Sequence, residues 1–187
     1  MPLTRLLRFL WALTQRVFVW GLIAFVLVCA FFIAMNASNI FISLKDAMQT
    51  RVAVAMHRTD EASMTKYFTP EFIAWDTAYR DGRYDASNVR GFDHWLRFHM
   101  IWAWPWETTA VAEVTEIVRS IDGEVYAAYL TEEQRMSGEK VPPPEWPAAK
   151  YRIVLSQQEG RWLVAALEKI EDAPQPTPLP SQTPSGP

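Results

Sequence analysis

Residues 17–35 read VFVWGLIAFVLVCAFFIAM, nineteen residues without a charged side chain. The uncharged stretch runs on to Leu44, which makes 28 residues from Val17. Because an α-helix rises about 1.5 Å per residue, roughly 20 residues cross the hydrocarbon layer of a bilayer. Trp20 and Asn36 lie near the two ends, where an indole or an amide group can reach headgroups and water. The stretch predicts a transmembrane helix over residues 17–39.

Three other interpretations of this stretch compete with a membrane anchor. A cleaved signal peptide has a shorter apolar region of about 7–15 residues and small residues before the cleavage site, whereas Met35 stands at the −3 position of the best candidate site. A lipoprotein needs a small residue before its cysteine, but Val28 precedes Cys29. A buried core helix is the third alternative, and it is disfavoured by apolarity on all sides over five turns together with the asymmetric charges at the flanks. We therefore interpret the stretch as an uncleaved anchor.

The charges that flank the apolar stretch predict its orientation. The first 16 residues carry Arg5, Arg8 and Arg16 and no acid, while Lys45 and Asp46 cancel one another after the uncharged run. By the positive-inside rule, the N-terminus is expected in the cytoplasm of the cell and the chain from about residue 40 outside the membrane. We thus expect a basic cytoplasmic tail over residues 1–16, the transmembrane helix over 17–39, an extracytoplasmic domain over 40–172 and a disordered proline-rich tail over 173–187.

The composition limits what the domain can be. The chain has 187 residues, of which 50% are hydrophobic and 13% aromatic, so it can bury a core. Its formal net charge of −3 argues against nucleic acid as a partner. A single cysteine excludes a disulfide framework and a cysteine-rich metal site. We find no metal-ligand spacing and no glycine-rich phosphate loop, and we expect no cofactor.

The first part of the domain has helical patterning and the second part has strand patterning. Apolar residues at helical spacing over 40–57 predict that the membrane helix continues into the domain. Short helices are expected over 61–68 and 71–79, followed by an aromatic strand or bent strand over 92–106. Alternating residues predict further strands, at 107–121, 124–135, 150–157 and 161–170, with two-residue turns at Asp122-Gly123 and Glu159-Gly160. Helices followed by an antiparallel meander indicate an α+β fold.

This order of elements resembles a known superfamily. A helix, the segment from Lys66 to Phe72 (KYFTPEF), an aromatic strand and hairpins that close on residues 160–164 (GRWLV) are similar to the nuclear-transport-factor-2-like superfamily, which has a cystatin-like cone fold. The resemblance covers about residues 44–172 and implies helices packed on a curved antiparallel sheet. With one membrane helix in front, the layout is also similar to bitopic assembly components of type IV secretion and conjugation systems, and to proteins associated with lipid-import complexes. No functional residues carry over from these families.

Aromatic residues are the candidates for a binding site. We single out Trp75, Tyr79, Trp95, Trp102, Trp104 and Trp106. These rings could fill the concave side of the sheet, line a ligand pocket or anchor a protein partner, or contact the bilayer surface. The sequence leaves these interpretations open.

Histidines are the candidates for acid–base chemistry. His94 and His99 are five residues apart, so on a strand they should point to opposite faces and could not act on one substrate. We expect one of them to be exposed and the other to be hydrogen-bonded at the sheet edge, and His57 to end a helix. We therefore predict no catalytic residues.

The function expected from these observations is a non-enzymatic one. The chain is interpreted as a single-pass membrane protein whose domain is an interaction and assembly module of a multi-protein envelope complex of the secretion or conjugation type. Its expected partners are the lipid bilayer and other proteins of that complex, and whether it forms a homo-oligomer stays open. The alternatives are a membrane-tethered domain that binds or converts a small ligand in the cone cavity, and an accessory subunit of a lipid-import or other membrane complex.

Overall fold

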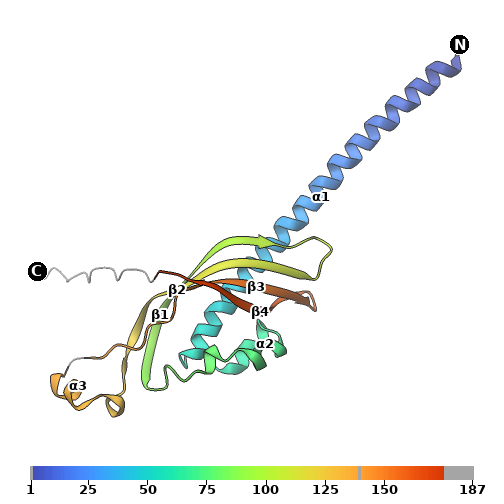
Figure 1. The fold of residues 1–187 in the computed structure, drawn as a ribbon. Coiled ribbons are helices and arrows are strands. Elements are labelled where there is room, and N and C mark those ends of the chain that lie inside the picture. The colour runs from blue at the N-terminus through green and yellow to red at the C-terminus, as the bar shows by residue number, and fades with distance from the viewer. Residues whose placement is uncertain (1, 139, 175–187) are drawn as a thin grey trace, which may run out of the picture.

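The computed structural model describes residues 2–138 and 140–174 and has an α+β fold. One very long helix, α1 (Pro2–Ala55), leads into a domain that contains a four-stranded antiparallel sheet (Figure 1). Residues 175–187 of the predicted proline-rich tail lie outside the described residues. The domain contains the expected order of helices followed by strands.

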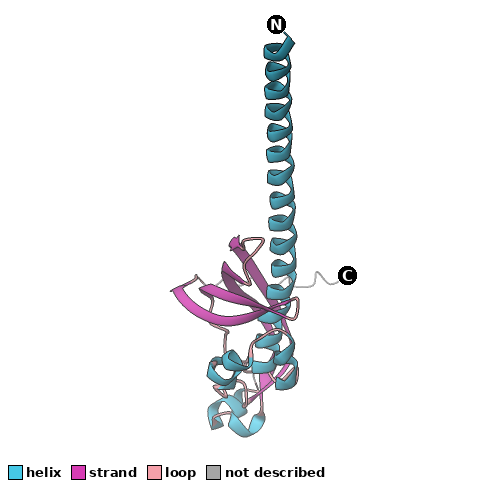
Figure 2. Cartoon of the chain, turned by 90° about the vertical axis from the view of Figure 1, so that its right-hand side faces the viewer, coloured by secondary structure: helices cyan, strands magenta, loops and turns pink. Residues whose placement is uncertain are grey.

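Helix α1 has two halves with opposite surroundings. Its large apolar side chains between Leu10 and Met35 are exposed, and this length of helix stands clear of the domain (Figure 2). From Ile40 onward one face of the same helix is buried, with Leu44, Met48 and Val52 shielded from solvent as well. The helix is thus long and apolar enough to span a membrane, and its C-terminal part forms the core of the domain.

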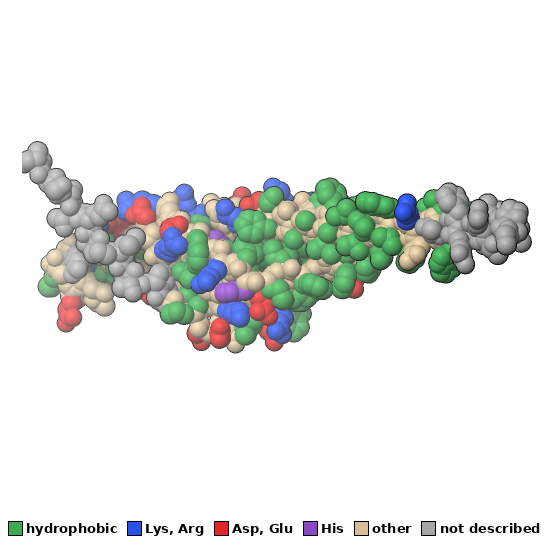
Figure 3. All heavy atoms as spheres, turned by 90° about the horizontal axis from the view of Figure 1, so that it is seen from above, with side chains coloured by type: hydrophobic (Ala, Val, Ile, Leu, Met, Phe, Trp, Pro, Cys, Tyr) green, Lys and Arg blue, Asp and Glu red, His purple; other side chains and the backbone are tan. Residues whose placement is uncertain are grey.

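The exposed half of α1 differs visibly from the domain surface. Hydrophobic side chains cover the projecting helix, whereas acidic and basic side chains are spread over the domain (Figure 3). The helix continues unbroken from the apolar stretch into the domain, as the helical spacing over residues 40–57 predicts.

Short helices follow α1 and pack beneath the sheet. They are the 3₁₀ helix η1 (Glu61–Lys66), α2 (Pro70–Trp75) and η2 (Ala78–Arg80). Thr69 caps α2 by accepting a hydrogen bond from the backbone N–H of Phe72, and proline occupies the first helical position. These elements lie close to the predicted helices over 61–68 and 71–79.

The sheet is a meander in which each strand pairs with the next. Its strands are β1 (Ser87–Trp102), β2 (Thr109–Val125), β3 (Ala149–Gln158) and β4 (Arg161–Asp172), in the spatial order β1-β2-β3-β4. Glu159 and Gly160 connect β3 to β4 with φ angles of 51° and 76°, which confirms the predicted two-residue turn. Residues 92–102 of the predicted aromatic strand lie in β1, whereas residues 103–106 belong to the connection with β2. Three register shifts interrupt the pairing of β1 with β2.

The turn predicted at Asp122-Gly123 is wrong, because β2 runs straight through these residues. Gly123 pairs with Val89 of β1. A Cβ atom on Gly123 would lie 2.9 Å from the Cα atom of Val89 and would clash with the backbone oxygen of Asn88. Gly123 therefore allows the two strands to approach closely; it does not reverse the chain.

The strand predicted over 124–135 is also wrong beyond Val125. The chain forms the 3₁₀ helix η3 (Ala127–Tyr129) and then α3 (Glu132–Ser137). Thr131 and Gln134 form a reciprocal capping box at the start of α3, and Gly138 ends it with a φ of 65°. Beyond α3, residues 140–148 form neither helix nor strand.

Candidate functional site

A cluster of charged side chains is buried between α1, α2 and the inner face of the sheet. Arg51 on α1 donates from Nε to Oδ2 of Asp76 at 2.6 Å and from Nη2 to Oδ1 at 3.2 Å. The Nη1 atom of Arg51 lies 3.8 Å from Oε2 of Glu116, which is on β2 and is 0% exposed. One guanidinium therefore lies between two carboxylates that come from different elements of the fold.

Glu116 also has two hydrogen-bonding partners. Nε2 of His94 lies 3.1 Å from its Oε1 atom, and Nε1 of Trp146 donates to its Oε2 atom at 3.1 Å. The indole ring of Trp146 also lies 5.7 Å from the Arg51 guanidinium carbon, within the range of a cation–π contact. Both carboxylate oxygens of Glu116 are thus occupied as hydrogen-bond acceptors.

The electrostatics of this cluster keep Arg51 charged. Burial opposes the charge, but the hydrogen bond to Asp76 and the charge of Glu116 outweigh it and raise the pKa of Arg51. Burial, followed by the nearby charge of Glu116, raises the pKa of Tyr151, so its hydroxyl stays protonated. The cluster, which we call the buried ion cluster, holds α1 against the sheet. Its carboxylate on Glu116 is fully buried, whereas Asp76 is partly exposed and borders a surface groove.

The two strand histidines lie on opposite faces of the sheet, as their spacing predicts. His94 is on the inner face, within the buried ion cluster. His99 is exposed on the outer face, where its Nε2 atom lies 2.8 Å from Oγ1 of Thr115. Both are on β1, an edge strand, and His94 is more deeply buried than an edge position suggests. The pair does not form one site.

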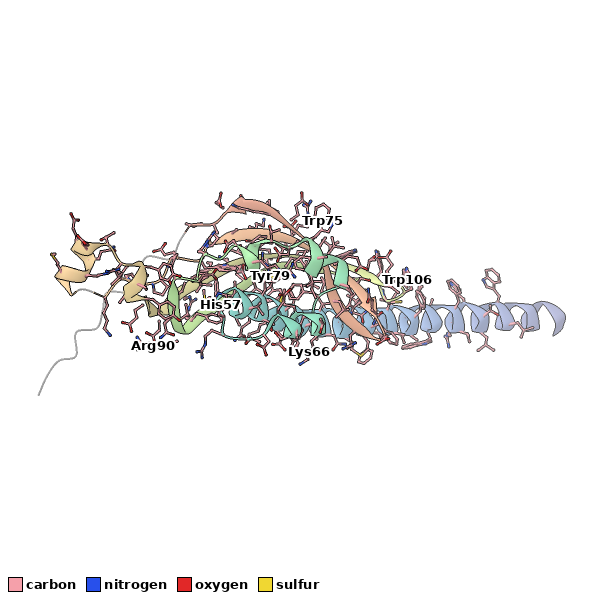
Figure 4. All side chains as sticks on the ribbon, turned by 90° about the horizontal axis from the view of Figure 1, so that it is seen from below. His57, Lys66, Trp75, Tyr79, Arg90 and Trp106 are labelled. Carbon is pink, nitrogen blue, oxygen red and sulfur yellow. The ribbon has the colours of Figure 1, made fainter. Side chains whose placement is uncertain are left out.

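An open cleft of about 610 Å³ lies where α1 ends. His57, which follows α1 with a φ of 55°, places its Nε2 atom 2.7 Å from Oδ1 of Asp85. Glu61 bonds to both Arg80 and the hydroxyl of Tyr79. These groups line the cleft (Figure 4), so it presents acids and bases side by side.

The proton affinities in this cleft are set by local contacts. The hydrogen bond from Arg80 lowers the pKa of Glu61. Burial, followed by the hydrogen bond to Glu61, raises the pKa of Tyr79 to about 12, so the phenol is neutral at physiological pH. The cleft offers hydrogen bonds and charges of both signs to a polar molecule. The pKa values of Glu61, Tyr79 and Arg80 are all shifted away from neutrality.

A second opening, a groove of about 400 Å³, runs between α2 and β4. Phe72, Ala166 and Leu167 form much of its lining. Trp75 stands at its edge and is 86% exposed, and Figure 4 shows it projecting from the domain. We call this feature the Trp75 groove. An exposed tryptophan beside an apolar groove is typical of a protein-binding surface.

Three tryptophans gather where β1 turns into β2. The rings of Trp102 and Trp104 meet edge to face with centroids 5.3 Å apart, and those of Trp104 and Trp106 stack at 5.1 Å. Their exposed fractions are 54%, 37% and 67% in chain order. We call residues 100–109 the tryptophan hairpin.

The six aromatic residues singled out in the sequence therefore occupy separate places. Tyr79 is buried at the cleft, Trp75 borders its groove, and Trp95 lies on the outer sheet face with the Arg119 guanidinium carbon 4.9 Å from its ring centroid. The interpretation that the tryptophans fill the concave side of the sheet is wrong for all five. That space is filled instead by α1, by the stacked rings of Phe68 and Phe72, and by other buried apolar residues.

The sequence interpretation missed the charged members of the buried ion cluster, although periodicity carried a signal for them. Arg51 falls at helical spacing with Ala47, Met48 and Ala55, all of which are buried. Glu116 takes the place of an apolar residue in the alternating inner row of β2. A charge at an apolar position of a periodic element indicates that this charge is buried.

Metal binding has no obvious place in the described residues. Within residues 2–138 and 140–174, no three histidine, cysteine, aspartate or glutamate side chains come together as a metal site would require.

Comparison with known proteins finds no matching protein family, no matching curated protein and no matching solved structure.

Proposed function

We propose that this chain is a single-pass membrane protein whose domain acts as an interaction and assembly module of a multi-protein envelope complex. The observation that carries the proposal is the continuity of α1. The same helix exposes apolar side chains up to Met35 and buries them from Ile40 onward. A membrane span that is also the core helix of a domain fixes the height and the orientation of that domain above the bilayer.

We also propose a specific fold family for the domain and a specific orientation of the chain in the membrane. Helices on one face of a bulged antiparallel sheet are consistent with a nuclear-transport-factor-2-like cone. The bases before Val17 favour a cytoplasmic N-terminus and an extracytoplasmic domain. One membrane helix in front of such a domain is similar in layout to the bitopic assembly components of secretion and conjugation systems.

The distribution of ionisable groups supports an interaction module over an enzyme. The one strand histidine that meets a carboxylate does so in the buried ion cluster, where Glu116 is 0% exposed. By contrast, the Trp75 groove is open and apolar. The domain thus has an accessible apolar surface for a protein partner, whereas its histidine–carboxylate pair on the sheet is buried away from any substrate.

A photo-crosslinking experiment in cells tests the proposal. Trp75 is replaced by the photoreactive p-benzoylphenylalanine in the full chain, and Tyr129, which is also well exposed but lies on η3, serves as the control position. We expect defined adducts with one or a few membrane-complex proteins from position 75 and none from position 129. Equal adducts from both positions, or none from either, would contradict the proposal.

The open cleft at the end of α1 favours one alternative, a tethered domain that binds a small polar ligand. Arg80→Ala removes a cation that lines the cleft, and Trp75→Ala removes the ring that borders the groove. Under the proposal, Trp75→Ala reduces recovery of the complex from mildly solubilised membranes and Arg80→Ala does not. The reverse result favours the ligand-binding alternative.

A further inference from the structure

The tryptophan hairpin lies at the end of the domain from which α1 projects. The connection between β1 and β2 reaches up beside the helix as it leaves the domain (Figures 1 and 2). Trp106 lies on this side of the domain, next to the projecting length of α1 (Figure 4). The hairpin is therefore directed toward the apolar half of the helix.

One contact fixes how far the hairpin reaches along α1. The rings of Phe41 on α1 and Phe98 on β1 pack with centroids 4.4 Å apart. Phe41 lies six residues beyond Met35, which is about 9 Å along a helix, and Trp102 lies four residues beyond Phe98, which is about 13 Å along a strand. Even an inclined strand thus brings the hairpin level with the last residues of the apolar stretch.

The composition of the hairpin fits the boundary between lipid and water. Residues 100–109 read MIWAWPWETT, in which Glu107 is the only charged residue. Tryptophan favours the headgroup region of a bilayer, because its ring is apolar while its N–H group can bond to water or to lipid esters. Three clustered indoles that are exposed to water on a domain surface, by contrast, form an apolar patch of the kind that marks a contact site.

We infer that the tryptophan hairpin inserts into the headgroup region of the bilayer that α1 spans, as a second contact between the domain and the lipid. This inference rests on the proposed function in one respect, since it requires α1 to be the membrane span. The second contact restrains rotation of the domain about the helix axis and tilt toward the membrane. It thereby keeps the Trp75 groove at a fixed angle to the membrane plane.

Spin labels on the full chain in lipid nanodiscs test the inference. In a variant with Cys29→Ala, single cysteines are introduced by Glu107→Cys in the hairpin, by Val26→Cys in the apolar stretch and by Glu133→Cys in α3. Each label is then probed with oxygen, which partitions into lipid, and with a water-soluble nickel chelate. The bilayer consists of phosphatidylcholine and phosphatidylglycerol.

The three positions separate the inference from the proposed function. We expect the label at 26 to be in the bilayer core, the label at 107 at headgroup depth and the label at 133 in water. If the label at 26 is in water, the proposed membrane span itself is wrong. If the label at 26 is in lipid while the label at 107 is as accessible to nickel as the label at 133, the span stands and the inference is wrong. A label at 107 that neither reagent reaches indicates a protein contact, such as a second copy of the chain, and also overturns the inference.

Substitution of the rings gives an independent test. The triple variant Trp102→Ser, Trp104→Ser and Trp106→Ser should raise the nickel accessibility of the label at 107 to that of the label at 133. The matched control Trp75→Ser removes an exposed tryptophan that lies outside the hairpin and should leave the label at 107 unchanged. If the triple variant leaves the label at headgroup depth, the tryptophans do not hold the hairpin there.

Discussion

The buried ion cluster and the tryptophan hairpin both depart from the usual placement of side chains. The cluster places charged groups inside the domain, and the hairpin places apolar rings on its surface. In the first, Arg51, Asp76 and Glu116 are charged and lie inside the domain. In the second, three of the largest apolar side chains in the chain lie on its surface. Both are built on the β1–β2 pair, the cluster in its middle and the hairpin at its end.

The two regions differ in what offsets the unfavourable placement of their side chains. Within the cluster, each carboxylate accepts hydrogen bonds from side chains that the fold itself supplies. A buried polar group is tolerated when it is paired in this way. The hairpin rings contact one another but remain exposed, so their compensation has to come from outside the domain. The cluster therefore stabilises the folded domain, whereas the hairpin is suited to contact something outside the domain.

The largest effect is expected from Glu116→Ala, which removes the shared acceptor of the cluster. Arg51, His94 and Trp146 would lose a partner while remaining buried, and breaking a buried pair costs about 3–5 kcal/mol. The control Glu113→Ala removes a carboxylate of the same strand that pairs with Arg152 on the outer face, where the cost is about 0–1 kcal/mol. Urea unfolding of the detergent-solubilised protein measures both. Equal losses would show that the cluster does not stabilise the domain.

Tyr84 sharpens the comparison because its hydroxyl is buried without a hydrogen-bond partner among the described residues. Burial raises the pKa of Tyr84 to about 12, above its ordinary value of about 10. The stability that depends on the neutral phenol is therefore complete below pH 10 and lost as the pH rises toward 12. In the wild type, ionisation of Tyr84 should lower the free energy of unfolding by about 2 kcal/mol over this range, and Tyr84→Phe should remove this contribution.

Unfolding free energies of the two proteins at pH 7 and at high pH check this expectation. At pH 7 the Phe variant should be at least as stable, because it removes an unpaired buried hydroxyl. Tyr126→Phe, at an exposed position, is the control and should leave the pH dependence as it is. Because the pKa values of Tyr79 and Tyr151 are raised as well, part of the pH dependence should remain in Tyr84→Phe, and a dependence as steep as that of the wild type would rule out Tyr84 as a source.

The two histidines of β1 offer a comparison within one strand. His94→Ala leaves Glu116 with one donor fewer in a buried setting, for which we expect a loss of about 1–3 kcal/mol. His99→Ala removes an exposed contact to Thr115 and should change the free energy of unfolding by less than about 0.5 kcal/mol. Thermal or chemical unfolding measures both. A larger loss for the His99 variant would reverse the assignment of the two faces.

A small effect on stability is also expected from the tryptophan hairpin. Replacing Trp102, Trp104 and Trp106 by serine should lower the free energy of unfolding by less than about 1 kcal/mol, because the rings are exposed. Replacing a buried tryptophan such as Trp162 by alanine should lower the free energy of unfolding by about 3–5 kcal/mol. If the triple variant unfolds as readily as Trp162→Ala, the hairpin is part of the core.

Local patterns predicted the elements whose signals are also local. The apolar stretch, the extension of α1, the aromatic strand and the Glu159-Gly160 turn follow from periodicity and from the backbone freedom of glycine. Asp122-Gly123 carries the same turn signal, yet β2 continues through it because Gly123 is packed against Asn88 and Val89 of β1. A contact between residues more than thirty positions apart overrode the local preference.

The candidate site was less predictable for a similar reason. Alternation places Trp102, Trp104 and Trp106 on one side of the hairpin but does not say whether that side meets the core or the surroundings. The start of α3 could have been predicted, since Thr131 and Gln134 have the spacing of a capping box. The pairing of Arg51 with Asp76 and Glu116, however, depends on how α1 crosses the sheet, which no local pattern determines.

The central claim is that α1 crosses the bilayer and holds the domain on the extracytoplasmic side of the membrane. Labelling with a membrane-impermeant maleimide tests it most directly, in a variant with Cys29→Ala and a single cysteine introduced by either Thr14→Cys or Glu133→Cys. The account predicts that intact cells, or spheroplasts where an outer layer blocks the reagent, are labelled at position 133. It also predicts that position 14 is labelled only after the membrane is permeabilised. Labelling at position 14 with protection of position 133 would contradict the orientation, and labelling of both positions before permeabilisation would contradict the membrane span.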